Sequence, residues 1–215
     1  MSDFEKMNND YLRKIYVPDV YQKSVFNIDY DKLKEAGIKL ISFDIDDTIA
    51  PIEKSNPDKE ILTFFGSLKQ KGFDIYILSN ANYDRVKNFG NKLGIEAIPR
   101  AQKPQSEGFE TLKKLYYEKH GIELSPKEMA HIGNNIITDV AGGNSFGTVT
   151  CLVRNFGKFI IIVSKIRFWS EGKQIRKELL KRDIWRKHHL NEPDDQYYQL
   201  GEKQVMPELP VNNVF

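Results

Sequence analysis

The sequence predicts an α/β protein with three layers, in which a central parallel sheet of about five strands lies between two layers of helices. Apolar runs typical of strands alternate with helical patterns from residue 38 onward, and this alternation favours parallel strands joined by helical crossovers. Polar residues gather just after the strand-like runs, where open parallel sheets bind their ligands. The 215 residues, 40% of them hydrophobic, are enough to bury one substantial core.

The predicted strands are short and follow one another at regular intervals. Apolar runs place them at residues 38–44, 73–80, 128–133 and 147–153, with a further strand between Gly94 and Lys103. Neither an internal repeat nor a low-complexity tract interrupts this order. Five strands separated by helices are therefore expected to form one sheet.

Three helices are predicted between these strands from apolar residues at helical spacing. The first is expected to start at Asn56-Pro57, as an N-cap followed by a proline in the first turn, and to end at Gly72. The second spans residues 82–93 and stops at Gly94, and the third ends at Gly121. Their predicted buried stripes are Ile61, Leu62, Phe65 and Leu68; Val86, Phe89 and Leu93; and Phe109, Leu112, Leu115 and Tyr116.

Charge divides the chain into three parts. Residues 1–153 carry 20 Lys and Arg against 22 Asp and Glu, residues 154–190 carry 11 against 3, and residues 191–215 carry 1 against 5. We expect a core of residues 1–153, a basic segment of residues 154–190 that contains aromatic residues, and a flexible acidic tail of residues 191–215. The overall charge of +2 conceals this asymmetry.

The sequence favours a cytoplasmic protein. Its single cysteine, Cys151, lies in an apolar run and cannot form an internal disulfide. The first residues lack the basic and apolar regions of an export signal. The longest apolar run, at 159–163, is far shorter than the roughly 20 residues of a membrane-spanning helix.

Four loops are expected to meet at the carboxyl edge of the sheet. Their polar residues follow four successive strands, and at this edge helix N-termini also direct N–H groups toward a ligand. Taken singly, each could be an ordinary cap or turn, but their order along the chain favours a functional site. These residues are Asp44, Asp46 and Thr48; Ser79 and Asn80; Lys103; and Asn134 and Asp139.

The motifs that contain these residues resemble a known family. "DIDDT", "SN", "KP" and "GNNIITD" are similar to the four motifs of the haloacid dehalogenase (HAD) superfamily of phosphatases, which implies a Rossmann-like fold. Residues 17–153 further resemble the YqeG-type branch of subfamily IIIA, which is related to the mitochondrial phosphatidylglycerophosphate phosphatase. One position departs from the pattern, because Asn134 stands where the family usually has an aspartate.

The resemblance implies phosphate monoester hydrolysis in two steps. Asp44 would attack phosphorus to form an aspartyl phosphate, and Asp46 would act as general acid and then as general base. Thr48, Ser79 and Asn80 would contact the phosphoryl oxygens, and Lys103 would neutralise developing charge. The implied cofactor is Mg²⁺, with ligands from Asp44, the Asp46 backbone carbonyl, Asp139 and Asn134.

The spacing of the motifs predicts that the fold has no cap domain. Asp44 and Ser79 are 35 positions apart, and Ser79 and Lys103 are 24 apart, which leaves room only for the expected helices. An uncapped site suits a phosphate on a large substrate. By resemblance, that substrate is the lipid headgroup of phosphatidylglycerophosphate, in phospholipid synthesis.

Two alternatives remain open at this stage. The first is a phosphatase for a soluble or protein-borne phosphate, and the second is a weakly active interaction module that has lost metal affinity through Asn134. The basic segment, residues 154–190, suggests peripheral contact with an anionic membrane, although helices that pack on the core explain it equally well. A nucleic-acid partner is not expected, because no nucleic-acid motif accompanies the charge.

Overall fold

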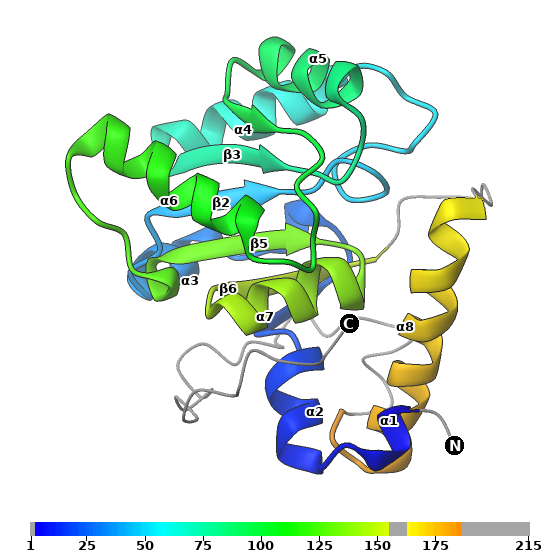
Figure 1. Ribbon diagram of the computed structural model, residues 1–215. Helices are drawn as coiled ribbons and strands as arrows, with labels where there is room; N and C mark the ends of the chain where they lie inside the picture. The colour runs from blue at the N-terminus through cyan, green and yellow to red at the C-terminus, as the bar shows by residue number, and fades with distance from the viewer. Residues whose placement is uncertain (1–2, 155–162, 186–215) are drawn as a thin grey trace.

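The computed structural model describes residues 3–154 and 163–185 and consists of a parallel sheet between layers of helices (Figure 1). The six strands lie in the order β1-β6-β5-β2-β3-β4, and every pair is parallel. Their bounds are β1 Val20–Gln22, β2 Leu40–Phe43, β3 Asp74–Leu78, β4 Ala97–Ile98, β5 Met129–Gly133 and β6 Val149–Val153. The predicted α/β class with a parallel sheet is confirmed.

The sheet has one strand more than the five that the sequence indicated. This strand is β1, which pairs with β6 at the edge of the sheet, with Val20 opposite Cys151. Its three residues are all buried, so they show no alternation of buried and exposed positions that would mark a strand. Pairing with β6, far along the chain, therefore decides its conformation.

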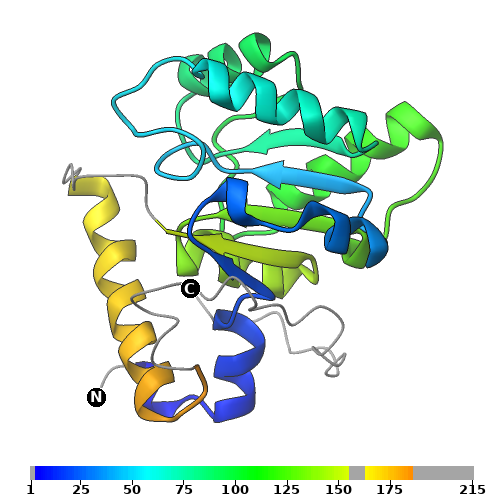
Figure 2. The ribbon, with the colours of Figure 1, turned by 180° about the vertical axis from the view of Figure 1, so that it is seen from behind.

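Helices cover both faces of the sheet (Figures 1 and 2). Helices α3, α4 and α5 contribute to the apolar core on one face, and α6 with α7 packs on the other. The α-helices are α1 Asp3–Lys6, α2 Asn9–Tyr16, α3 Tyr30–Glu35, α4 Lys59–Gln70, α5 Tyr83–Leu93, α6 Glu107–His120, α7 Gly142–Phe146 and α8 Val163–Lys181. Short 3₁₀ turns are η1 Val25–Asn27 and η2 Pro126–Glu128, and η3 Ile136–Ala141 is a π-helical turn.

The start and the buried stripe of α4 differ from the prediction. The N-cap is Asp58, whose carboxylate accepts a hydrogen bond from the N–H of Ile61, whereas Asn56 accepts one from Asn88 instead. Leu62 is exposed, because the sheet contacts only one narrow face of the helix. The predicted stripe of α5 is buried as expected, and α5 ends at Gly94 with φ +61°.

A second apolar cluster joins the two ends of the described chain. Helices α1 and α2 lie beside α8, and both Figure 1 and Figure 2 show them below the sheet. Ile175 and Leu179 of α8 are fully buried in this cluster, together with Leu12 of α2. Four residues of the basic segment, Ile175, Leu179, Ile184 and Trp185, are thus buried in this cluster. Positions 155–162 and 186–190 of that segment, and the predicted acidic tail at 191–215, lie outside the described residues.

Candidate active site

The loop that follows β2 carries three of the predicted site residues. The N–H of Asp44 donates to the carbonyl of Ile132 (2.9 Å), so Asp44 sits at the end of the β2–β5 ladder. The chain then turns at Asp47, whose φ of +59° lies in the left-handed region that aspartate tolerates better than most residues. This turn brings Thr48 to Asn134, and the Thr48 hydroxyl donates to Asn134 Oδ1 at 3.3 Å.

The loops after β3 and β4 are joined through the amide of Asn80. Asn80 Nδ2 donates to the carbonyl of Lys103 (2.7 Å), and Asn80 Oδ1 accepts from the N–H of Lys103 (2.8 Å). Both polar atoms of the amide therefore contact the Lys103 backbone. The phosphate contact of Asn80 stays a prediction. Ser79 is buried, and its hydroxyl oxygen accepts a hydrogen bond from the N–H of Ala81 (3.3 Å).

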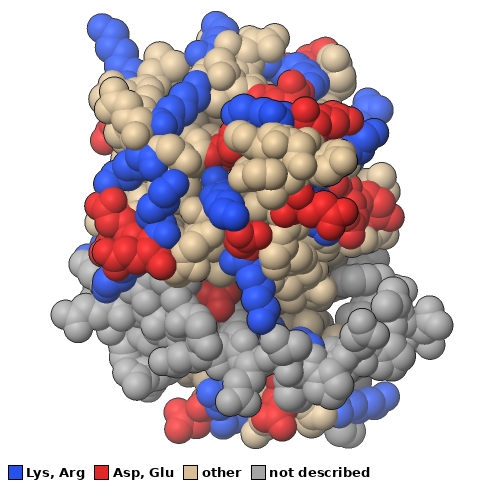
Figure 3. Space-filling view, turned by 90° about the vertical axis from the view of Figure 1, so that its left-hand side faces the viewer, with Lys and Arg blue, Asp and Glu red and all other residues tan. Residues whose placement is uncertain are grey.

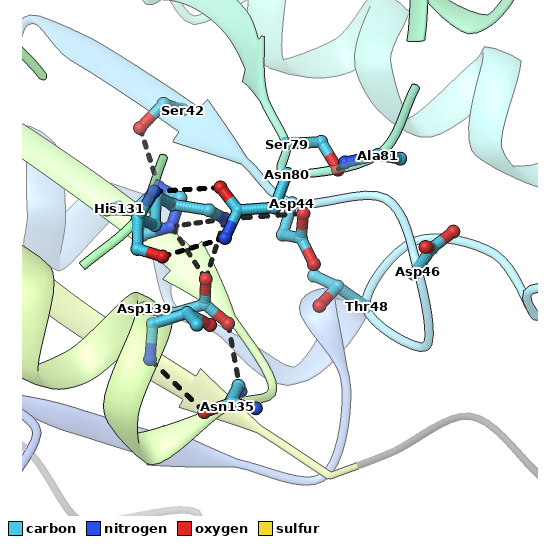
Figure 4. A network of polar contacts seen from close by, with 12 residues as sticks. Ser42, Asp44, Asp46, Thr48, Ser79, Asn80, Ala81, His131, Asn135 and Asp139 are labelled. Atoms are coloured by element: carbon cyan, nitrogen blue, oxygen red, sulfur yellow. Dashed lines mark hydrogen bonds and ion pairs between the residues drawn. The ribbon is translucent and has the colours of Figure 1, made fainter. Parts of the chain in front are cut away.

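Lys103 connects two of the predicted carboxylates. Its Nζ lies 2.7 Å from Asp139 Oδ1 and 3.3 Å from Asp44 Oδ1. The side chains of Lys103 and Asp139 are only 1% and 2% exposed, whereas that of Asp44 is 13% exposed. Residues from three separate segments thus form one ion cluster, and Asp44 is its most exposed member. Figure 4 shows Asp44 and Asp139 in this network.

Burial and pairing shift the pKa values of this cluster in opposite directions. Burial raises the pKa of Asp44, and the negative charges of Asp139 and Asp46 raise it further against the effect of Lys103. Burial alone would also raise the pKa of Asp139, but Lys103 and His131 outweigh it and the pKa of Asp139 is lowered. The pKa of Lys103 is raised despite its burial, because two carboxylates stabilise its charge. An added cation near Asp44 would therefore favour its ionised form.

His131 is a site residue that the sequence analysis missed. It lies within β5, and its Nε2 is 3.2 Å from Asp139 Oδ1 and 3.3 Å from Lys103 Nζ. Its Nδ1 is 2.9 Å from the hydroxyl of Ser42 on the paired strand β2 (Figure 4). Burial and then the charge of Lys103 lower the pKa of His131. The signal in the sequence is a polar residue inside an apolar strand-like run, before the strand end where ligands usually bind.

The π-helical turn η3 holds Asp139 in place. Asp139 Oδ2 accepts a hydrogen bond from the N–H of Asn135 (2.9 Å), and Asn135 Oδ1 accepts from the N–H groups of Ile137 and Thr138. A Cβ atom at Gly133 would lie 2.2 Å from Asp139 Cγ. A side chain at position 133 would therefore displace the carboxylate, which explains the glycine at the end of β5.

Asp46 pairs with a second residue that the sequence analysis missed. Arg85, in the first turn of α5, donates from Nε to Asp46 Oδ1 at 2.7 Å. Figure 4 shows Asp46 on the loop after β2, apart from the dashed network around His131 and Asp139. The structure thus gathers Asp44, Lys103 and Asp139 in one cluster and places Asp46 in a separate ion pair at its side.

The fold and these contacts are typical of one class of protein, the α/β enzymes that bind their ligands at the carboxyl edge of a parallel sheet. Residues 20–147 match the haloacid dehalogenase-like hydrolases, and the chain belongs to this family. The resemblance expected from the four motifs is confirmed at the level of the family.

Relatives agree with this assignment. The chain is 35% identical over 142 residues to "Probable phosphatase YqeG" of Bacillus subtilis (strain 168), a match that covers 66% of this chain and 79% of the relative. Together with family membership, this confirms the predicted enzyme class, a HAD-type phosphatase.

Solved structures are similar at much lower identity. The cobalt-bound deoxy-D-mannose-octulosonate 8-phosphate phosphatase (YrbI) from Haemophilus influenzae is 14% identical, with 71% of this chain and 95% of that one covered and a TM-score of 0.39. The 3-deoxy-D-manno-octulosonate 8-phosphate phosphatase from Moraxella catarrhalis, in complex with magnesium ion, phosphate ion and KDO, is 19% identical, with 72% and 96% covered and a TM-score of 0.39.

Proposed function

We propose that this protein is a Mg²⁺-dependent phosphomonoester hydrolase that forms an aspartyl phosphate on Asp44. One observation carries the proposal: Asp44 is the accessible carboxylate of a cluster whose other members, Lys103 and Asp139, are buried. Lys103 Nζ lies 3.3 Å from Asp44 Oδ1, so its ammonium would be close to an anionic phosphoryl group that approaches Asp44. That ammonium would offset the charge that develops on the phosphoryl oxygens.

The reaction would proceed in two displacements at phosphorus. A carboxylate oxygen of Asp44 forms a bond to phosphorus while the bond to the leaving oxygen breaks, and Asp46 supplies the proton to that oxygen. Asp46 then takes a proton from water, which attacks phosphorus, and the bond to Asp44 breaks to release phosphate. The hydroxyls of Ser79 and Thr48 would donate to phosphoryl oxygens during both displacements.

The donor atoms at this edge suit magnesium, which prefers carboxylate, carbonyl and water oxygens. Asp44 and Asn134 would hold the ion with the backbone carbonyl of Asp46 and the remaining lone pairs of Asp139. When bound, Mg²⁺ would neutralise charge on the phosphoryl group. Both oxygens of Asp139 already accept hydrogen bonds, and among the residues described no group of three His, Cys, Asp or Glu is placed to hold a metal. We therefore propose weaker metal binding than an aspartate at position 134 would give.

The proposed substrate is phosphatidylglycerophosphate. Support comes from the resemblance of residues 17–153 and from the open site, since only α4, β3, α5 and β4 occupy the intervals between the motifs. Contact with a membrane surface through residues 154–190 remains part of this proposal. Among the described residues, no helix combines the length and the apolar character needed to cross a bilayer. A soluble or protein-borne phosphate is the second candidate, because an open site also admits such substrates.

Phosphate release from vesicles that contain phosphatidylglycerophosphate tests the proposal. We expect release that requires Mg²⁺, and a loss of at least about 10³-fold in kcat for Asp44→Asn, since the covalent step needs this carboxylate. Equal release by wild type and variant would refute the mechanism. Faster release from short soluble monoesters than from vesicles would favour the second candidate.

Calorimetry with Mg²⁺ examines the remaining alternative, an interaction module with little activity. Binding by wild type at millimolar Mg²⁺ supports the phosphatase. No binding by wild type, with binding restored in Asn134→Asp, would support the interaction module, because one added carboxylate would then supply the missing ligand.

A further inference from the structure

We propose that Arg85 is the positioning residue for Asp46, and that it holds this carboxylate on the side of the site from which the leaving group departs. The inference rests on the proposed function and assigns a role to a residue outside the four motifs. It starts from the ion pair between Arg85 Nε and Asp46 Oδ1, at 2.7 Å. The two side chains are only 15% and 8% exposed, so solvent screens the pair much less than it screens a surface ion pair.

The guanidinium of Arg85 is anchored by more than this one contact. Nη1 donates to the carbonyl of Lys54 (2.7 Å), and Nη2 lies 3.4 Å from the carbonyl of Pro51. The guanidinium carbon also lies 5.2 Å from the centre of the buried Phe89 ring, one turn further along α5. Each nitrogen of the planar fork therefore has an acceptor, and the orientation of Nε toward Asp46 is determined by α5 and the loop together.

These contacts place Asp46 where a general acid is needed. In an in-line displacement the attacking and leaving oxygens lie on opposite sides of phosphorus. A group that protonates the leaving oxygen must therefore stand away from the nucleophile, Asp44. Asp46 meets this requirement in position, because Arg85 holds its Oδ1 and the side chain stands apart from the Lys103 cluster (Figure 4). In the protonated form of Asp46, the other oxygen, Oδ2, would carry the proton that passes to the leaving oxygen.

Asn88, also on α5, contacts the same loop as Arg85. A surface cavity of about 310 Å³ is lined by Ser55, Asp84, Arg85 and Asn88, between the loop after β2 and helix α5. Asn88 closes one side of it, since its amide donates to the carbonyl of Ser55 (2.7 Å) and to Asn56 Oδ1 (2.9 Å). Asn88 thus ties the same loop to α5 through Ser55 and Asn56 rather than through Asp46, which makes it a matched control for Arg85.

The dependence of kcat on the leaving group distinguishes this role from simple support of the fold. 4-Nitrophenolate departs without protonation, whereas an alkoxide needs a general acid. We would measure kcat of wild type, Arg85→Gln, Arg85→Lys and Asn88→Ala with 4-nitrophenyl phosphate and with ethyl phosphate. Asp46→Asn provides the reference for loss of the acid itself.

The inference predicts a selective effect on ethyl phosphate. Arg85→Gln should raise the ratio of kcat on 4-nitrophenyl phosphate to kcat on ethyl phosphate by about 10-fold or more, in the direction of Asp46→Asn, because general acid catalysis contributes about 10²–10⁴-fold. Arg85→Lys, which keeps a cation near Asp46, should restore part of the ratio. Asn88→Ala should leave the ratio at the wild-type value.

Three results would overturn the inference. An unchanged ratio in Arg85→Gln, with wild type active through Asp44, would refute the role of Arg85 and leave the proposed function intact. The same change of ratio in Asn88→Ala would assign the effect to the loop as a whole. The proposed function, and this inference with it, would be refuted if wild type turned over neither substrate. The same conclusion would follow if Asp44→Asn retained the turnover of wild type.

Discussion

Lysine, histidine and aspartate meet at both ends of the central sheet, but in different surroundings. At the carboxyl ends of the strands, Lys103, His131 and Asp139 are almost completely buried. At the amino ends, Asp74 pairs with Lys119 and lies 2.6 Å from His120 Nε2. The side chains of this second lysine and histidine are 59% and 34% exposed.

The surface at the amino ends mixes charges of both signs. Figure 3 shows this face, where Lys and Arg are interspersed with Asp and Glu. Besides the pairs of Asp74, it includes Lys71 with Asp31 at 2.5 Å, and both of these side chains are well exposed. Water competes with such pairs, and each contributes little to stability.

The comparison teaches that burial, rather than residue type, distinguishes the two clusters. A buried ion pair is costly to form, because both charges lose their contact with water. Replacing one of the two residues is strongly destabilising, because it leaves the other charge uncompensated in a low dielectric. In the buried cluster, the pKa of Asp139 is lowered and that of Lys103 is raised. Such perturbed groups beside an accessible carboxylate are typical of catalytic sites.

The largest expected effect contrasts Asp139→Asn with Asp74→Asn. The first variant leaves the buried ammonium of Lys103 without its nearest carboxylate and should lower the free energy of unfolding by about 3–5 kcal/mol. The second removes a partner of partly exposed side chains and should cost about 1 kcal/mol or less. Urea denaturation at neutral pH measures both, and equal losses would contradict the contrast.

The second prediction concerns rate rather than stability and compares the two lysines. Lys103→Gln should lower kcat on a phosphate monoester by about 10²–10³-fold, because it removes the charge that opposes the developing negative charge in the transition state. Lys119→Gln, at the far end of the sheet, should stay within about 2-fold of wild type, since it lies more than a Debye length from the site in physiological salt. A large loss in both variants would indicate a general effect on folding.

The smallest predicted effect is the pH dependence of stability through His131. Burial and then Lys103 lower its pKa, so the unfolded chain takes up a proton near pH 6.5 while the folded chain stays neutral. This contribution to stability is complete above about pH 6.5 and is lost as the pH falls toward the folded pKa, at up to about 1.4 kcal/mol per pH unit.

The variant His131→Gln isolates this contribution. Its free energy of unfolding, measured in urea from about pH 5 to about pH 8, should fall less steeply on acidification than that of wild type. Because glutamine does not titrate, the difference between the two slopes arises from protonation of His131. Identical slopes would show that this histidine does not stay neutral in the folded chain.

The local sequence determined the parallel α/β class and the loops that form the site. Buried strands of 4–8 residues and capped helices are visible in a single chain, because their periodicity and their end residues are neighbours in sequence. The same holds for Asp44, Ser79, Lys103 and Asp139, which follow strand ends that must meet at one edge of a parallel sheet. Their convergence could be predicted without coordinates.

Tertiary structure alone decided three features. Strand β1 forms because β6, about 130 positions away, supplies its hydrogen bonds. His131 enters the site because strand pairing and the turn η3 bring Lys103 and Asp139 against it. Arg85 reaches Asp46 across 39 positions because α5 packs beside the loop after β2.

The sequence determined which groups carry charge and which segments form helices and strands. Packing decided which charges meet and which of them are shielded from water, because burial and distance arise only once separate segments share a core.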